Sequence, residues 1–285
     1  MTQALELPGR VSPLAALRFN AGAPRRVLAL HGWLDNAMSF APLAAHLPDC
    51  EIIAIDLPGH GHSGHLPAGH GYHFIDYLDD ALDAMDALGW PRCHLLGHSL
   101  GGAVASTLAA ACPQRVDHLL LIEALGPLAG TPGKAAEALR QGIEARRRPV
   151  GAARALRDLD SAVAARLRAT PMQPDNARLL LTRNLIDDAD GLRWRSDLRL
   201  RLASPLRADE ASIGEWIAAI EAPTLLIVAD RHDGLFEHEL VARRSAGLRN
   251  GRVVRLPGAH HLHMDHPEPC AAAIRQALAE PTPPA

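Results

Sequence analysis

The sequence predicts an α/β fold, a mostly parallel sheet flanked by helices, with one helical insertion. Two observations lead to this prediction. Short apolar runs alternate along the chain with segments of helical spacing, which is typical of parallel strands joined by helices. The alternation stops between about residues 126 and 222, where the chain is rich in Ala, Arg and Leu and has no convincing strand. We therefore expect a helical cap between two strands of the sheet.

Each expected strand is a short apolar run. The runs are VLAL (27–30), IIAI (52–55), CHLL (93–96), LLLI (119–122), TLLIVA (224–229) and RVVRL (252–256). Runs that are apolar throughout predict strands buried on both faces. The clearest helix spans residues 74–88, whose apolar residues fall on one face and whose aspartates fall mostly on the other. Gly89 is expected to end this helix.

Composition and charge narrow the class of protein. The 285 residues are 48% hydrophobic and 21% charged, which fits a large globular domain. The net charge of -3 does not indicate binding to nucleic acid. The four scattered cysteines predict neither a disulfide framework nor a zinc site. We see no signal peptide and no apolar run near the roughly 20 residues of a membrane span. We therefore expect a cytoplasmic protein that does not bind membranes, and its oligomeric state stays open.

A Gly-x-Ser-x-Gly motif, Gly97 to Gly101, lies between an expected strand and an Ala-rich helix. Ser99 would occupy a tight, strained turn, and the flanking glycines would keep Cβ atoms out of a crowded corner. The Ser99 hydroxyl would then project above the sheet, where the backbone N–H of Leu100 can face a developing oxyanion. In this strand–turn–helix setting the motif predicts a serine nucleophile.

With this motif the chain resembles the α/β-hydrolase superfamily, in its serine-hydrolase-like branch. Further matching stretches are LHGW (30–33), DLPGHGHSG (56–64), CPQRV (112–116) and LPGAHHLHMDHPE (256–268). The resemblance implies the α/β-hydrolase fold, with a helical cap inserted after the sixth strand. It also implies that Trp33, after the His-Gly pair, donates the second oxyanion-hole N–H.

The same resemblance implies a division of the chain. We expect an N-terminal part of the core at residues 1–125, the cap at 126–222 and the rest of the core at 223–285. The arginines of the first cap helices are expected to lie on a solvated surface.

Two other patterns resemble a cofactor-binding motif and a metal site, but we expect neither a cofactor nor a metal. Residues 59–64 spell Gly-x-Gly-x-x-Gly, but no helix is expected until about residue 74, so the pyrophosphate-binding helix N-terminus is missing. The histidine-rich stretches 60–65 and 260–266 fall on expected loops with irregular spacing, which does not favour metal ligation. The expected partner is a small-molecule substrate.

The catalytic base should follow the last strand, because the triad histidine comes last in α/β-hydrolases. Two adjacent histidines, His260 and His261, occupy that loop. The family pattern, read back from Asp265 and Pro267, selects His260 and leaves His261 as the alternative.

Three carboxylates compete for the triad acid. Glu123 follows a buried run in the stretch I-E-A-L-G-P, which resembles the acid segment that a minority of the superfamily carries after the sixth strand. Asp230 and Asp233 follow the seventh strand, where most members carry the acid, but the expected spacing of three residues after Ala229 is not met. We favour Glu123 and keep Asp233 and Asp230 as alternatives. The acid should lie within about 3.2 Å of His260 Nδ1.

The sequence therefore predicts a cofactor-free serine hydrolase, carboxylesterase-like, that acts through an acyl-enzyme intermediate. The Leu- and Ala-rich cap favours a small apolar ester or a related acyl substrate, whereas Arg193 and Arg195 offer binding groups for a carboxylate. The alternatives are a small-molecule binding module with a vestigial triad, a C–C hydrolase, a lactonase and a haloperoxidase.

Overall fold

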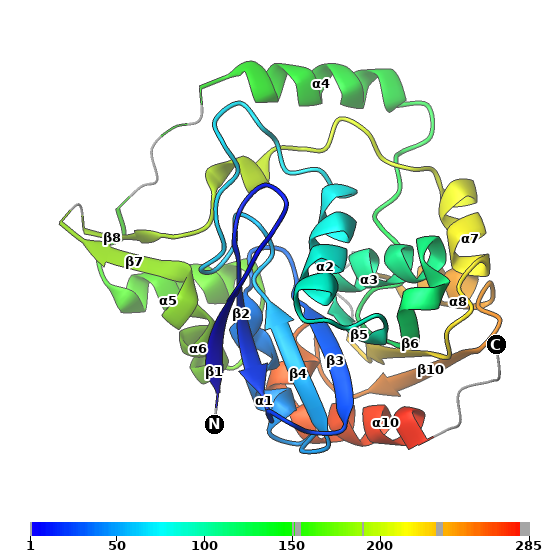
Figure 1. Ribbon diagram of the computed structural model, residues 1–285. Helices are drawn as coiled ribbons and strands as arrows, with labels where there is room; N and C mark the ends of the chain where they lie inside the picture. The colour runs from blue at the N-terminus through cyan, green and yellow to red at the C-terminus, as the bar shows by residue number, and fades with distance from the viewer. Residues whose placement is uncertain (1, 150, 152–154, 190, 232–235, 280–285) are drawn as a thin grey trace.

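The computed structural model describes residues 2–149, 151, 155–189, 191–231 and 236–279. Its centre is an eight-stranded sheet with strand order β1-β2-β4-β3-β5-β6-β9-β10 (Figure 1). The strands are β1 (Gln3–Leu7), β2 (Leu14–Phe19), β3 (Arg25–Leu30), β4 (Cys50–Ile55), β5 (Cys93–His98), β6 (Val116–Ile122), β9 (Thr224–Ala229) and β10 (Gly251–Leu256). All neighbours from β4 to β10 pair in parallel, which confirms the predicted fold class.

The six expected strands are confirmed, and two more precede them. Strands β1 and β2 form an antiparallel hairpin, and β2 pairs antiparallel with β4 at the edge of the parallel sheet. The pattern of apolar runs did not predict them. Residues 14–19 read LAALRF, in which Ala and Leu favour strands less than β-branched residues do. Residues 3–7 carry a single buried side chain, Leu7.

Helices cover both faces of the sheet (Figure 1). One face packs against α2 (Asp76–Ala87), α3 (Leu100–Ala111), α7 (Glu210–Ala218) and α8 (His238–Ser245) around one apolar cluster. The other face packs against α1 (Ala41–Ala44) and α10 (Pro267–Ala279) around a second cluster. Short helices are η1 (Ala37–Phe40), η2 (Pro113–Arg115), η3 (Leu198–Arg201) and α9 (Leu262–Asp265). No helix among the described residues is both long and apolar enough to cross a membrane.

The insertion follows β6, as predicted, and returns to the sheet at β9. Its helices are α4 (Ala135–Arg147), α5 (Leu159–Ala169), α6 (Pro174–Asn184) and α7. The expectation that it holds no strand is wrong, because β7 (Leu185–Asp188) and β8 (Gly191–Trp194) form an antiparallel hairpin. In this hairpin Leu185 pairs with Trp194, and both pack against the small apolar cluster between α5 and α6. Tertiary packing thus overrides the helical composition of the segment.

The parallel strands β3, β4, β5, β6, β9 and β10 end at one edge of the sheet, where open α/β sheets bind ligands. Three of the four non-glycine residues with positive φ in the described chain follow β3, β5 and β6: Leu34 (φ 61), Ser99 (φ 50) and Glu123 (φ 58). Strained backbone of this kind persists where the surrounding structure holds it in place, and it gathers at functional sites. The candidate site therefore lies at this edge.

Candidate active site

Ser99 occupies a sharp turn between β5 and α3. Its backbone has φ 50 and ψ -116, a conformation that costs energy for a residue with a side chain. Two hydrogen bonds fix the turn: the Ser99 N–H donates to Ile122 O at 3.0 Å, and the Gly101 N–H donates to His31 O at 3.0 Å. The turn is therefore tied to the ends of both neighbouring strands, β6 and β3.

The glycines on either side of Ser99 are required by close packing. A Cβ on Gly97 would lie 2.4 Å from Gly101 O, and a Cβ on Gly101 would lie 1.9 Å from Leu30 O. Both separations are far below any real contact, and the obstacles are backbone atoms that cannot rotate away. The Gly-x-Ser-x-Gly spacing thus follows from the way α3 begins directly against β3 and β5.

Two backbone N–H groups stand near the turn as candidate oxyanion donors. Leu100 is the first residue of α3, and the first N–H groups of a helix have no partner within the helix. Trp33 lies two residues after His31, whose carbonyl oxygen accepts from Gly101. The Trp33 side chain is 52% exposed, and its Nε1 donates to Leu200 O of the insertion at 3.1 Å.

Glu123 and His260 meet at the strand ends. Glu123 follows β6 and is buried, and its Oε1 accepts from the Ala229 N–H at 2.5 Å. Its Oε2 lies 3.4 Å from His260 Nδ1. This separation is slightly longer than the limit of about 3.2 Å that we set for the triad acid. Catalytic hydrogen bonds are often long before a substrate binds, so this separation alone does not exclude Glu123 as the triad acid.

The other carboxylates have different places. Asp230 is exposed, and its Oδ1 accepts from the Gly258 N–H at 3.0 Å, so it fixes the start of the histidine loop. Asp233 lies outside the described residues. The Nε2 of the alternative base, His261, lies 3.0 Å from Asp35 Oδ2.

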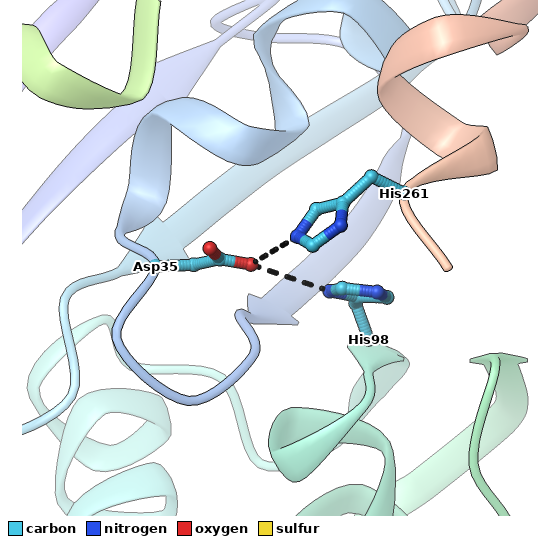
Figure 2. A group of neighbouring side chains, drawn as sticks. All are labelled: Asp35, His98 and His261. Atoms are coloured by element: carbon cyan, nitrogen blue, oxygen red, sulfur yellow. Dashed lines mark hydrogen bonds and ion pairs between the residues drawn. The ribbon is translucent and has the colours of Figure 1, made fainter. Parts of the chain in front are cut away.

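A buried polar cluster that the sequence did not predict lies beside this site. Asp35 Oδ2 lies 3.0 Å from His261 Nε2 and 3.6 Å from His98 Nδ1, as Figure 2 shows. Burial opposes the ionisation of Asp35, yet His261, Arg166 and His98 around it hold its pKa well below the ordinary value. Burial lowers the pKa of His98 to about 3 and also lowers the pKa of His261. The cluster thus places one carboxylate and two imidazoles together in a buried site.

Arginines of the insertion reach this cluster and its surroundings. Arg166 of α5 donates to Asp35 Oδ1 at 2.5 Å, and its Nη2 lies 3.1 Å from His261 Nε2. Arg183 of α6 donates to Asp56 Oδ2 at 2.5 Å, where both side chains are buried. The arginines of α4, by contrast, are exposed, as expected from the sequence. The sequence did contain one indication of these buried ion pairs, because Asp35 and Asp56 each closely follow an apolar strand.

The Gly-x-Gly-x-x-Gly stretch has a structural role around Asp56. A Cβ on Gly61 would lie 2.3 Å from the Asp56 carboxyl carbon, and a Cβ on Gly59 would lie 2.6 Å from the Tyr72 ring. The His62 N–H donates to Asp56 Oδ2 at 2.8 Å. The next helix is α2, which begins at Asp76. The loop therefore wraps a carboxylate and does not open a helix.

Comparison with known proteins shows the family of this chain. Residues 25–267 match a family model described as the alpha/beta hydrolase fold. The chain is 30% identical over 274 residues to serine hydrolase-like protein 2 of Homo sapiens, covering 88% of this chain and 86% of that protein. It is 29% identical to a serine hydrolase-like protein of Danio rerio, covering 95% of this chain and 87% of that protein.

Solved structures give the same result. The crystal structure of a hypothetical protein from Pseudomonas aeruginosa superposes with a TM-score of 0.88 at 36% identity, covering 97% of this chain and 98% of that chain. A thioesterase domain from the curacin biosynthetic pathway superposes with a TM-score of 0.86 at 23% identity, over 96% and 99% of the two chains, and this likeness shows the fold alone. The strand order, the turn at Ser99 and these matches lead to one conclusion: the chain belongs to the α/β-hydrolase fold family.

Proposed function

We propose that the protein is a serine hydrolase that cleaves a small, apolar ester or related acyl substrate through an acyl-enzyme intermediate. The main support for this proposal is the strained turn at Ser99, which is packed so closely that only glycine fits at positions 97 and 101. A strained strand-to-helix turn of this kind presents a nucleophile to the substrate. The similarity to serine hydrolase-like proteins supports the same chemistry.

In the proposed mechanism His260 accepts the hydroxyl proton of Ser99 while the Ser99 oxygen attacks the substrate carbonyl. The backbone N–H groups of Leu100 and Trp33 bind the resulting oxyanion, and each such donor lowers the barrier by about 3 to 4 kcal/mol. His260 then protonates the leaving group. Water, activated by the same histidine, releases the acyl group and restores Ser99.

Glu123 is proposed as the acid that orients His260. Its Oε1 is held by the Ala229 N–H, which leaves Oε2 to face the imidazole Nδ1. An acid in this place keeps the proton on Nδ1, so that Nε2 is free to accept from Ser99, and it stabilises the imidazolium that forms. Asp233 stays the alternative, and the variants described in the Discussion separate the two.

The proposed substrate class rests on the surroundings of the site. The insertion is rich in Leu and Ala, and Trp33, whose indole N–H donates to Leu200 O of the insertion, is about half exposed. Of the two arginines considered for a carboxylate, Arg193 forms an ion pair with Asp188 on the β7–β8 hairpin. These features favour an apolar acyl or alcohol group in the substrate.

Labelling with a fluorophosphonate probe tests the proposal. The probe should label wild-type protein at Ser99 and should not label Ser99→Ala. Ser106→Ala is the matched control, because Ser106 lies on α3 but is buried and donates to Gly102 O. A folded wild-type protein that resists labelling would instead support a binding module with a vestigial triad. A panel of esters, lactones and C–C substrates then separates the remaining reactions.

A further inference from the structure

The buried cluster of Asp35, His98 and His261 offers three ligand atoms around one small volume (Figure 2). The atoms are a carboxylate oxygen and two imidazole nitrogens, and all lie within 4.8 Å of one another. The side chains come from three separate segments: the loop after β3, the end of β5 and the loop after β10. All three are at least 97% buried, so the sheet edge holds them in fixed positions.

The hydrogen bond of His98 to the histidine loop fixes its tautomer. His98 Nε2 lies 2.9 Å from His260 O, and because a carbonyl oxygen only accepts, Nε2 must carry the proton and donate. In a neutral ring the other nitrogen, Nδ1, presents a lone pair toward Asp35 Oδ2 at 3.6 Å. Nδ1 has no hydrogen-bond partner among the described residues.

Two electron-pair donors therefore face each other without a proton between them. Such an arrangement is unfavourable in a buried site, where charges are poorly screened. The Arg166 guanidinium offsets part of this electron-pair repulsion from one side, since its Nη2 lies 2.5 Å from Asp35 Oδ1 and 3.1 Å from His261 Nε2. A cation placed between Asp35 Oδ2 and the two imidazole nitrogens would offset the repulsion directly.

The two separations from the Asp35 oxygen fit a small divalent transition ion. Bonds of 2.0 to 2.1 Å in a tetrahedral site put ligand atoms about 3.3 Å apart. The separations from Asp35 Oδ2 are 3.0 Å to His261 Nε2 and 3.6 Å to His98 Nδ1, which bracket this value. The N–H at the second ring nitrogen of His98, Nε2, donates to a backbone carbonyl oxygen, as the second N–H of a metal-binding imidazole usually does.

We propose that Asp35, His98 and His261 form a binding site for one divalent transition ion of the zinc class, and that binding inhibits the enzyme. The ion would bind His261 Nε2 in the tautomer that carries its proton on Nδ1, and would replace the contacts that Nε2 now makes with Asp35 Oδ2 and with Arg166 of α5. It would also act on the catalytic loop, because His260 is the neighbour of His261 and its carbonyl oxygen accepts from His98. Binding stands on the geometry alone, whereas the inhibition rests on the proposed function.

The irregular spacing of the histidines in stretches 60–65 and 260–266 gave no reason to expect a metal. The proposed site takes only His261 from these stretches and joins it to Asp35 and to His98, whose Nδ1 has no hydrogen-bond partner among the described residues. The contact between the Asp35 carboxylate and His261 depends on the fold, so the sequence alone does not predict it.

Titration of untagged, chelator-treated protein with zinc, monitored by calorimetry, tests the site. Ser99→Ala should bind one zinc ion per chain as wild type does, whether or not the wild type hydrolyses esters. His98→Asn and His261→Asn should each lower the affinity at least about tenfold, since even changes behind the ligands cost that much. His94→Asn is the matched control, because His94 lies at the other end of β5. Cobalt in place of zinc should give the intense visible absorption of four-coordinate cobalt.

Arg166→Met keeps the test valid if a ligand variant fails to fold. It removes the competing cation and should raise the zinc affinity severalfold. The site is disproved if wild type takes up no zinc in the micromolar range, or if both histidine variants, folded, bind as wild type does. Zinc that binds at these residues without slowing ester hydrolysis contradicts the inhibition only. A wild type that binds zinc but shows no hydrolysis contradicts the proposed function and leaves the site standing.

Discussion

Glu123 Oε2 lies 3.4 Å from His260 Nδ1, although the two residues are 137 positions apart in the chain. Both stand at strand ends, Glu123 after β6 and His260 after β10, with β9 between them. The Ala229 N–H at the end of β9 holds the other oxygen of Glu123. The sheet thus aims a buried carboxylate at the proposed catalytic base.

Replacing this carboxylate should slow acylation strongly. Glu123→Gln keeps the size of the side chain but loses the charge that favours the productive tautomer, so we expect a loss of about 10³- to 10⁴-fold in acylation rate. Single-turnover kinetics with an activated ester measures it. Asp230→Asn should change the rate little, because Asp230 is exposed and bonds Gly258. A large loss in Asp233→Asn with a mild effect in Glu123→Gln would transfer the role to Asp233.

The turn at Ser99 should not tolerate a methyl group at Gly101. Gly101→Ala would put a Cβ 1.9 Å from Leu30 O, so the start of α3 must shift. We expect a loss of about 1 to 3 kcal/mol in the free energy of unfolding, together with loss of probe labelling.

Gly214→Ala is the control for this change. Gly214 lies within α7, and a Cβ there meets nothing within 4 Å. Alanine should therefore stabilise the protein by about 0.5 to 1 kcal/mol. Equal stability of the two variants in urea unfolding would contradict the packing argument.

The insertion should depend on one buried ion pair. Arg183→Met leaves the buried Asp56 carboxylate without its cation, which costs about 3 to 5 kcal/mol in the free energy of unfolding. Arg178→Met, on the same helix α6, removes an exposed pair with Asp160 and should cost at most about 1 kcal/mol. Urea unfolding measures both values, and similar losses in the two variants would show that the Arg183 pair does not anchor the insertion.

Buried neutral histidines should make the protein sensitive to acid. Burial lowers the pKa of His60 to about 3 and that of His94 to about 4, from an unfolded value of 6.5. Their contribution to stability is therefore complete above pH 6.5 and is lost as the pH falls toward these folded values. Each such histidine should lower the free energy of unfolding by about 1.4 kcal/mol per pH unit between pH 6 and 5.

His60→Asn should flatten this dependence by about that amount, whereas His70→Asn should not, because His70 is exposed. Urea unfolding at several pH values between 7.5 and 5 gives the slopes. Parallel curves for wild type and His60→Asn would show that His60 does not titrate as described.

The sequence predicted the features that depend on local order. The run TLLIVA matches β9 residue for residue, and the helix expected at 74–88 forms from Asp76 to Ala87. Ser99 lies on the expected turn, because glycine spacing and the strand–helix setting are local signals. The fold class and the position of the insertion followed from the same kind of pattern.

Features that depend on distant contacts could not be predicted in this way. The pair of Arg166 and Asp35 joins residues 131 positions apart, and only the docking of α5 on the sheet edge brings them together. The hairpin β7–β8 forms where Leu185 and Trp194 find an apolar cluster to pack on. The sequence likewise left three carboxylates open for His260, because spacing alone does not give a distance.

The most direct test of the account is burst kinetics with an activated ester such as p-nitrophenyl acetate. An acyl-enzyme on Ser99 predicts a rapid release of nitrophenol, close to one equivalent per chain, followed by a slower steady rate, and no burst in Ser99→Ala. A wild type that hydrolyses the ester without a burst, at a rate that Ser99→Ala retains, would contradict the proposed nucleophile.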